Sequence, residues 1–382
     1  MRTRSLAALL AVSMGVAALG AVPARASDTA ARPAVAVPKG FGGPGSVPWS
    51  SVGTGWILAT WSPANPTHVR ATARNYLVLI SPVGARYLLM PLSTEASLLA
   101  WSGDGQRALL QLSTKSSQSL KVLNLRTQTA LSTFAVPSAT NNSFQGASFT
   151  RPRGLALDVA TYTNGHNSVA RYSLGGTKQV TYPSAFSGVG SYDGAYVSSP
   201  DGTELVLGAA HGLATVTNDG TVLAQHPIGG ATSCQPKRWW STTLVLAACG
   251  IPSRLYLFSM TGAAPRALTQ RPVRPDYGDL SAWRLNSGTY VQVASACGYL
   301  YLAKLRGAAP TMVNVPGVPE GNTVLVQGAT STALALVTNL PCQGGPRLLW
   351  YTPSKDSTRV ILGRPVTSGT PGAVDVFPSP LG

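Results

Sequence analysis

The sequence is poor in acidic residues, histidine and cysteine, whereas glycine and proline are frequent along it. Against 29 Lys and Arg there are only 13 Asp and Glu, 4 His and 4 Cys. No H-E-x-x-H motif, no G-x-S-x-G turn and no C-x-x-C pair occurs, so neither a zinc site nor a serine-hydrolase elbow is expected. With 40 Gly and 29 Pro, long helices are excluded. We expect no metal and no cofactor.

The first 26 residues have the pattern of a signal peptide. Arg2 and Arg4 precede an apolar run, residues 6–22, and Ala24-Arg25-Ala26 is a small-x-small cleavage site. We expect a mature chain that starts at Ser27, is secreted and soluble, and has no transmembrane segment after signal cleavage. The alternative is an uncleaved membrane anchor, which the shortness of the apolar run disfavours.

After residues 27–45, a flexible leader rich in Ala, Pro and Gly, the chain repeats a strand–turn–strand unit seven times. In Arg254–Met260 and Pro265–Thr269, apolar residues alternate with others around a Gly-containing turn, which is typical of half-buried antiparallel strands. Equivalent positions recur every 42 to 48 residues, at Leu77, Val122, Ala170, Ala214, Tyr256, Tyr301 and Leu349. This is the size of a four-stranded propeller blade. The sequence predicts an all-β fold, a single seven-bladed β-propeller over residues 46–382.

A second hairpin precedes each of these units and would supply the inner strands. The clearest copies contain Trp101-Ser-Gly-Asp-Gly105 and Ser199-Pro-Asp-Gly202. Asp and Gly suit tight turns because they tolerate a positive φ. An aromatic residue followed by Ser-x-Asp-Gly resembles the repeat of TolB-like and WD-type (WD40-like) propellers. Over roughly residues 50–365 the chain also resembles secreted actinobacterial propellers of unassigned function, although only two of the seven blades carry the motif cleanly. The resemblance implies the fold and carries no function.

The ring must close, because an open propeller has two unpaired sheet edges. Gly372–Phe377 is similar to one more inner strand, and we expect its residues 373–377 to complete the first blade. Alternatively, Ser46–Trp49 supplies that strand and the C-terminus is free.

All four cysteines lie in the last three predicted blades, and in an exported protein they are expected to form disulfides. Cys234 and Cys249 flank the Trp239–Thr243 hairpin symmetrically, which favours their pairing. Cys297 and Cys342 fall at similar places in adjacent blades and would form the second bridge, although four cysteines allow three pairings.

Positive charge dominates the chain. Removing the three arginines of the signal peptide lowers the formal net charge from +16 to +13. Such a basic protein attracts polyanions, and the expected partners are an anionic wall polymer, a glycan or a protein. The basic residues are scattered, so no specific nucleic acid is expected.

Ligand-binding residues are expected on loops at one mouth of the propeller. Tyr192-Asp193 and Tyr277-Gly278-Asp279 enter the inner strands of two blades in the same way. Tyr192, Asp193, Tyr277 and Asp279 are therefore the candidate ligand-binding residues, since aromatic rings beside carboxylates suit sugar or peptide contacts. The alternative is that the tyrosines pack between blades and the aspartates bind loop amides.

Together these features favour a non-catalytic, monomeric propeller, outside the cell and associated with the wall, that binds or scaffolds a wall polymer, a glycan or a protein. The alternative is a secreted hydrolase or lyase of acidic polysaccharides that uses Asp193 and Asp279. No pair of catalytic carboxylates stands out among the thirteen acids.

Overall fold

The computed structural model describes residues 37–63, 75–139, 142–270, 278–295, 299–338 and 345–377. The chain divides into two units, Met1–Ala36 and Val37–Gly382. The first unit holds the expected signal peptide and the start of the expected leader, and it lies outside the described residues.

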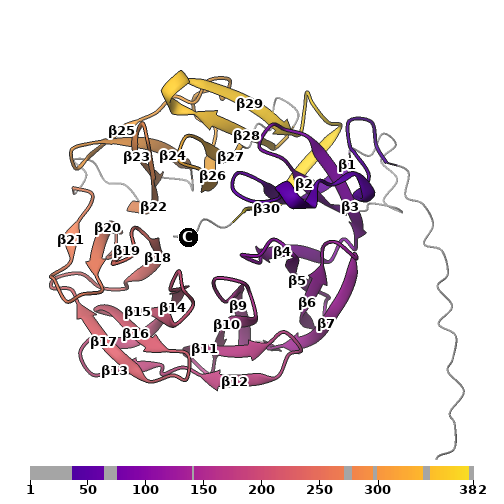
Figure 1. Cartoon of the computed structure of the whole chain (residues 1–382). Helices are drawn as coiled ribbons and strands as arrows, with labels where there is room; N and C mark the ends of the chain where they lie inside the picture. Colours follow the sequence, from indigo (N-terminus) through magenta and orange to yellow (C-terminus); the bar gives the residue numbers. More distant parts are fainter. Residues whose placement is uncertain are drawn as a thin grey trace, which may run out of the picture. The chain divides into compact units, whose positions relative to one another are not determined.

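The second unit is a ring of seven antiparallel sheets, each counted here as a blade with strands a to d from the centre outward (Figure 1). Blade 1 contains β30 (Gly369–Val376), β1 (Ile57–Pro63), β2 (Asn75–Ile80) and β3 (Arg86–Leu92), and blade 2 contains β4 (Ala96–Trp101), β5 (Arg107–Ser113), β6 (Gln118–Asn124) and β7 (Thr129–Val136). Blade 3 contains β9 (Asn142–Phe149), β10 (Ala156–Thr163), β11 (His166–Ser173) and β12 (Lys178–Thr181). Blade 4 contains β14 (Gly190–Ser198), β15 (Glu204–Ala209), β16 (Gly212–Thr217) and β17 (Val222–Pro227).

Blade 5 contains β18 (Gln235–Trp239), β19 (Leu244–Cys249), β20 (Arg254–Ser259) and β21 (Arg266–Ala267). Blade 6 contains β22 (Gly278–Leu285), β23 (Gly288–Ala294), β24 (Leu300–Arg306) and β25 (Ala309–Met312). Blade 7 contains β26 (Val324–Ala329), β27 (Leu334–Thr338), β28 (Arg347–Thr352) and β29 (Ser357–Leu362). Two-residue strands, β8 (Ser138–Ala139) and β13 (Ala185–Phe186), extend blades 3 and 4. The prediction of an all-β, seven-bladed propeller is confirmed.

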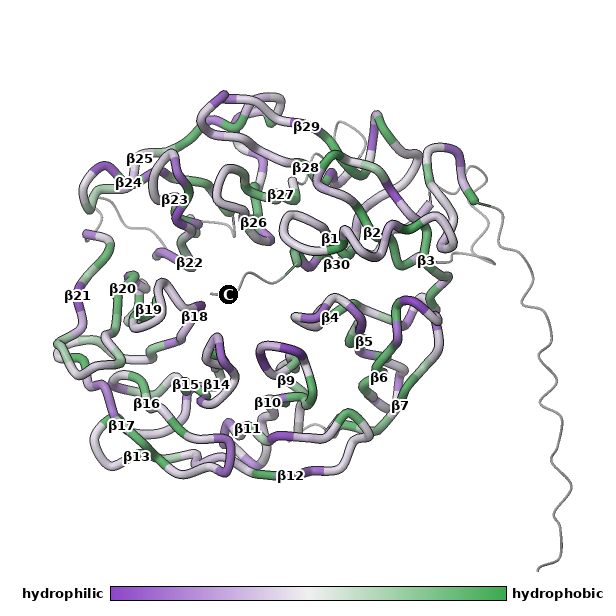
Figure 2. The backbone as a smooth tube through the Cα atoms, viewed as in Figure 1, coloured by the Kyte–Doolittle hydropathy of each residue, from purple (hydrophilic) through white to green (hydrophobic). Residues whose placement is uncertain are grey.

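The middle strands are more buried than alternation predicts. In β5, Ala108, Leu109 and Leu110 are at most 1% exposed although they are consecutive. Each blade is covered by a neighbour on both faces, so both sides of strands b and c meet apolar side chains. The outer strand β7, in contrast, is mostly exposed. Accordingly, hydrophobic colour follows the strands in Figure 2 and hydrophilic colour gathers in turns.

Every pairing between strands a and b contains a register shift. An extra residue in one strand bends it, raises its twist and redirects its side chains. These irregularities lie nearest the axis of the ring, where neighbouring blades converge. They matter for the site described below.

The a–b turns form as their sequence predicts. Ser102 Oγ donates to Asp104 Oδ1 over 2.6 Å, and the same oxygen of Asp104 accepts from the Gln106 amide. Gly105 follows with φ of 72°. The turn at Ser199 and Asp201 repeats this network.

The ring closes through the C-terminal strand, which was expected at about residues 373–377. Strand β30 pairs with β1, with Ile57 opposite Val376 and Leu58 opposite Asp375. Beyond it, the Phe377 amide donates to the Trp56 carbonyl over 2.8 Å. The chain from Pro44 to Ser51 forms two short 3-10 helices, η1 (Pro44–Ser46) and η2 (Trp49–Ser51), instead of the alternative strand.

Part of the expected leader is docked on the propeller. Gly42 forms a parallel bridge with Tyr87 in β3, and Phe41 lies 4.8 Å from Trp61, ring centre to ring centre. This contact covers part of the outer edge of blade 1, an edge that would otherwise be open to pairing with another chain.

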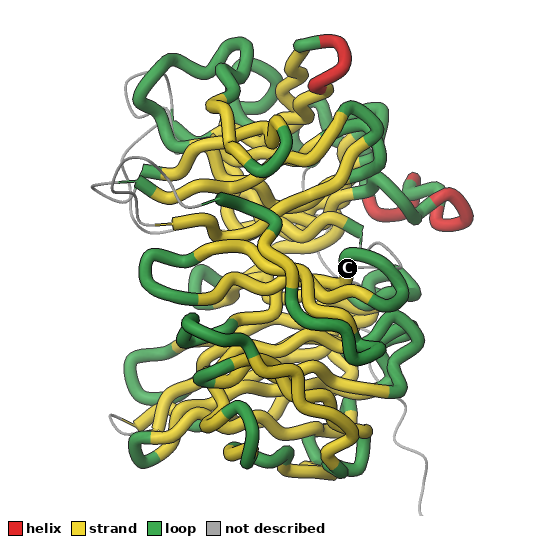
Figure 3. The backbone as a smooth tube through the Cα atoms, turned by 90° about the vertical axis from the view of Figure 1, so that its left-hand side faces the viewer, coloured by secondary structure: helices red, strands yellow, loops and turns green. Residues whose placement is uncertain are grey.

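Turned on its side, the ring has loops along two opposite faces (Figure 3). We call the face with the a–b and c–d turns the turn face, and the one with the b–c loops and the connections between blades the loop face.

Candidate functional site

A pocket of about 290 Å³ opens among the inner strands of blades 1 to 5. Its walls come from β30, β4, β9, β14 and β18, which lie around the centre of the ring in Figure 1. Aromatic and hydroxyl side chains contribute to the lining, with Trp101, Phe149 and Trp239 among the first and Ser148, Thr150 and Ser198 among the second. The lining also contains three cations, Arg151, Lys237 and Arg238, and one carboxylate, Asp375.

Arg151 is held in place by the turns of neighbouring blades. It follows β9, and its backbone lies against Gly202, where an added Cβ would lie 1.8 Å from the Arg151 carbonyl oxygen. On the other side, a Cβ on Gly103 would lie 2.0 Å from the carbonyl oxygen of Pro152. Only glycine permits these approaches, so the a–b turns of blades 2 and 4 fix the position of Arg151.

Lys237 and Arg238 both reach the pocket because β18 contains a register shift between Pro236 and Arg238. In a regular strand consecutive side chains point to opposite faces. The guanidinium of Arg238 stacks over Trp283 at 4.5 Å from the ring centre. Lys237 donates to the side-chain oxygen of Gln235 over 2.9 Å. These contacts orient both cations.

Asp375 joins the first blade to the second. Its Oδ2 accepts a hydrogen bond of 2.6 Å from the backbone amide of Trp101, in strand β4. Burial raises the pKa of Asp375 to about 7, against the opposing effects of the Trp101 amide and of the positive charge of Arg151. The carboxylate therefore changes its charge near neutral pH.

Partial burial lowers the pKa of all three cations. Burial and, to a smaller extent, the nearby positive charge of Arg151 lower the pKa of Arg238 to about 10. Burial also lowers the pKa of Arg151 and of Lys237, partly offset by Asp375 and by Asp193 respectively. Three positive charges thus face two negative ones, and each cation would be stabilised by an anion in the pocket.

Several buried polar atoms of the lining residues have no hydrogen-bond partner among the described residues. They are Nε of Arg238, Nε1 of Trp101 and of Trp239, and Oγ of Ser198. All four can donate a hydrogen bond, and unsatisfied buried donors are uncommon in folded proteins. Charge and unused donors therefore both fit an acceptor-rich anion.

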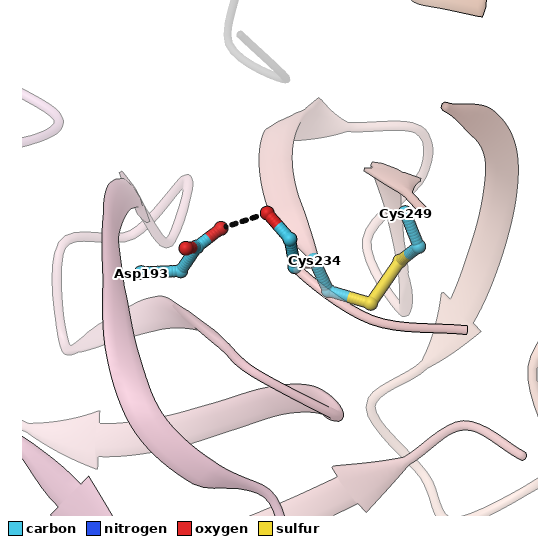
Figure 4. Close-up of a disulfide and its surroundings, with 4 residues drawn as sticks. Asp193, Cys234 and Cys249 are labelled. Atoms are coloured by element: carbon cyan, nitrogen blue, oxygen red, sulfur yellow. Dashed lines mark hydrogen bonds between the residues drawn. A yellow bond between two sulfur atoms is a disulfide. The ribbon is translucent and has the colours of Figure 1, made fainter. Parts of the chain in front are cut away.

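The candidate residues of the sequence analysis are not gathered in one exposed site. Tyr192 is 4% exposed, and its ring packs among apolar side chains that include Tyr182 and Phe186. Asp193 is partly exposed and accepts a hydrogen bond of 2.7 Å from Ser233 Oγ (Figure 4). Tyr277 lies outside the described residues.

Asp279 is buried at the junction of blades 5 and 6. It is 2% exposed, its Oδ2 accepts from Thr269 Oγ1, and that oxygen lies 3.9 Å from Nη1 of Arg254. Its backbone amide donates to the Ser253 carbonyl. The contacts of the Asp279 carboxylate described here are thus to a hydroxyl and a guanidinium inside the fold.

One of the two expected disulfides is present. Cys234 and Cys249, on either side of the β18–β19 hairpin, are bonded and buried (Figure 4). Cys297 and Cys342 lie outside the described residues, so the second bridge stays a prediction.

The sequence analysis did not single out Arg151, Lys237, Arg238 or Asp375 as ligand-binding residues. A usable signal existed. Inner strands are expected to be largely apolar, and Lys237-Arg238 within β18 and Asp375 within β30 interrupt that pattern. Charged residues in strands that are expected to be apolar indicate a binding site near the axis of the ring.

Comparisons with known proteins support the fold alone. The propeller domain of the Trilobed protease from Pyrococcus furiosus matches with a TM-score of 0.55 and 10% identity, over 82% of this chain and 93% of that one. Oligopeptidase B from Leishmania major matches with a TM-score of 0.51 and 8% sequence identity. The match covers 80% of this chain and 49% of that one. TolB from Acinetobacter baumannii matches with a TM-score of 0.48 and 10% sequence identity. The match covers 85% of this chain and 67% of that one. No family model and no curated protein matches the sequence.

The described ranges contain no group of three His, Cys, Asp or Glu side chains placed to hold a metal ion. They also contain no helix with the length and apolar character needed to cross a membrane.

Proposed function

We propose that this protein is an exported, non-catalytic propeller that binds an acidic extracellular ligand, a wall polymer, glycan or protein, through the basic pocket at its axis. The observation that carries the proposal is the pocket itself, in which three half-buried cations and several unused donors meet. Export is supported by the signal-peptide pattern, and the excess of positive charge favours anionic partners.

The hydrolase or lyase alternative is not favoured. It depends on Asp193 and Asp279 acting together, whereas Asp279 is buried against Thr269 and Arg254. A side chain in that position has no open path to a polysaccharide.

The first prediction tests binding with matched charge changes. Arg151→Gln and Arg238→Gln should each weaken binding of the mature protein to isolated wall polymer or polygalacturonate at least tenfold, about 1.4 kcal/mol. Arg266→Gln is the control, because it removes the same charge from an exposed position on the outer strand β21. Affinity is measured by titration at two salt concentrations, with melting temperature as a check on folding.

Equal loss in all three variants would mean that net charge alone drives binding, and the pocket would be rejected as the site. Cleavage of the polysaccharide, seen as new reducing ends, would reject the non-catalytic proposal.

A further inference from the structure

A second pocket, of about 530 Å³, lies where the ring closes between blades 7 and 1. Blade 7 contributes its a–b turn and strands β28 and β29, while blade 1 contributes Thr54 and Gly55, ahead of β1, and Pro82 in its c–d turn. Figure 1 shows the two blades side by side, with the yellow β28 and β29 next to the indigo β1 and β2. The turns that line this pocket belong to the turn face, and the proposed function makes no use of them.

Arg359, in β29, spans the junction of the two blades. Its Nη1 donates to the Val83 carbonyl over 3.1 Å and its Nη2 to the Pro82 carbonyl over 2.5 Å, so a guanidinium of blade 7 holds the c–d turn of blade 1. Both acceptors are uncharged, and no acidic side chain is among the described residues that line the pocket. The positive charge of Arg359 is therefore available to an anion.

Positive charge is in excess around the pocket. Lys355, the second cation of the lining, is exposed and makes no hydrogen bond or ion pair with any described residue. Burial and, to a smaller extent, the nearby charge of Arg359 lower the pKa of Arg86 in β3. Asp356, next to Lys355 in the sequence, is outside the lining and accepts a hydrogen bond from the Tyr351 hydroxyl. An anion in the pocket would meet two cations of the lining and no carboxylate.

Hydroxyl groups make up much of the remaining lining. The Thr330 hydroxyl is used within its own turn, and the Thr358 hydroxyl donates to the Pro316 carbonyl. Four others have no hydrogen-bond partner among the described residues: Thr54, Thr332, Thr352 and Ser357. Trp350, also in the lining, is 6% exposed, and its Nε1 likewise has no partner there. The pocket thus combines two cations with several unused donors.

This combination is best matched by a phosphate group with hydroxyls beside it. A phosphate monoester carries about −1.5 to −2 charges at neutral pH and has three acceptor oxygens, which suits two cations and several donors. A carboxylate is bound best by the planar fork of an arginine, but both terminal nitrogens of Arg359 already donate to carbonyls. Threonine and serine hydroxyls both donate and accept, so they can also bind the hydroxyls of a polyol.

We propose that the pocket at the closure of the ring binds the phosphate monoester of a small polyol, with the phosphate beside Lys355 and Arg359. The ligand contacts both blade 7 and blade 1, so its binding stabilises the closed ring by mass action. Binding is non-covalent. This second site is separate from the axial pocket and does not depend on the function proposed for it.

The second prediction uses glycerol 3-phosphate as the probe. It should bind the wild-type protein more tightly than inorganic phosphate, glycerol or the diester glycerophosphoglycerol, which carries only one negative charge. Lys355→Gln should weaken its binding about fivefold, the upper end for an exposed ion pair. Lys178→Gln is the matched control, because it removes the same charge from the exposed outer strand β12. Isothermal titration measures the affinities.

A second variant tests the hydroxyls without changing the charge. Replacing Thr332 and Thr352 together by Val keeps the shape of both side chains and should remove most of the preference for glycerol 3-phosphate over inorganic phosphate. Thermal melting shows whether the variant is folded. In the wild type, glycerol 3-phosphate should raise the melting temperature, and at equal concentration glycerol should raise it less.

The outcomes separate this site from the axial pocket. The proposal is wrong if glycerol 3-phosphate binds no more tightly than inorganic phosphate, or if Lys355→Gln and Lys178→Gln weaken binding equally. It is also wrong if Arg238→Gln abolishes this binding, since the ligand would then occupy the axial pocket. None of these results bears on polyanion binding through Arg151 and Arg238, which the first prediction tests.

Discussion

At the scale of single residues, two aspartates with similar sequence contexts have different environments. Asp193 follows Tyr192 directly within β14, and Asp279 is the second residue of β22, two positions after Tyr277. Asp193 is partly exposed with Ser233 as its partner, whereas Asp279 is enclosed by Thr269 and Arg254. The sequence could not distinguish them, because the burial of Asp279 comes from the packing of blade 5 against blade 6.

The third prediction uses this contrast. Asp279→Asn should lower the free energy of unfolding by about 1–3 kcal/mol, since it weakens charge-assisted bonds in a buried site. Asp193→Asn is the matched change and should stay within about 0.5 kcal/mol. Chemical denaturation of both variants measures the difference. Equal stability of the two would show that the buried contacts of Asp279 contribute nothing.

At the scale of elements, the hairpin of β18 and β19 carries both a stabilising disulfide and two cations of the pocket. Its disulfide links Cys234, next to β18, with Cys249 at the end of β19, while Lys237 and Arg238 extend from β18 into the pocket. The symmetry of the two cysteines about the turn allowed their pairing to be predicted. The register shift that brings both cations to one side has no signature in the spacing of residues.

The fourth prediction concerns this hairpin. Replacing Cys234 and Cys249 together by Ala should lower the free energy of unfolding by roughly 3 kcal/mol, because the bridge closes a loop of 15 residues in the unfolded chain. Thermal melting with and without reductant measures it: reductant should lower the melting temperature of the wild type and leave the variant unchanged. A wild type that melts identically in both conditions would contradict a stabilising bridge.

At the scale of the whole molecule, the architecture could be predicted and the pocket could not. Seven blades follow from a local pattern, since each hairpin carries its own alternation and turn residues. The pocket, in contrast, brings Arg151, Arg238 and Asp375 together from three different blades. No rule of local spacing relates such positions, so only the odd placement of charges in inner strands indicated them.

The fifth prediction tests ring closure. Truncation after Ser368 removes β30, leaves the inner edge of β1 unpaired and removes Asp375 from the pocket. The melting temperature should fall by well over 5 °C, and the protein should tend to self-associate, as light scattering would show. Removing only residues 379–382 is the control and should change neither property; an unchanged melting temperature in the longer deletion would contradict closure by β30.

The pairing of β1 with β30 also sets the order in which this chain can mature. Blades 2 to 7 are each continuous in sequence and can form as soon as their residues are available, whereas blade 1 joins Leu58 to Asp375. Contacts between distant positions form slowly, because the intervening chain must first be arranged. A chain under synthesis or refolding therefore holds β1 with one open edge until the very last strand arrives. A circular permutant opened between blades 1 and 2 would make every blade continuous and remove that delay.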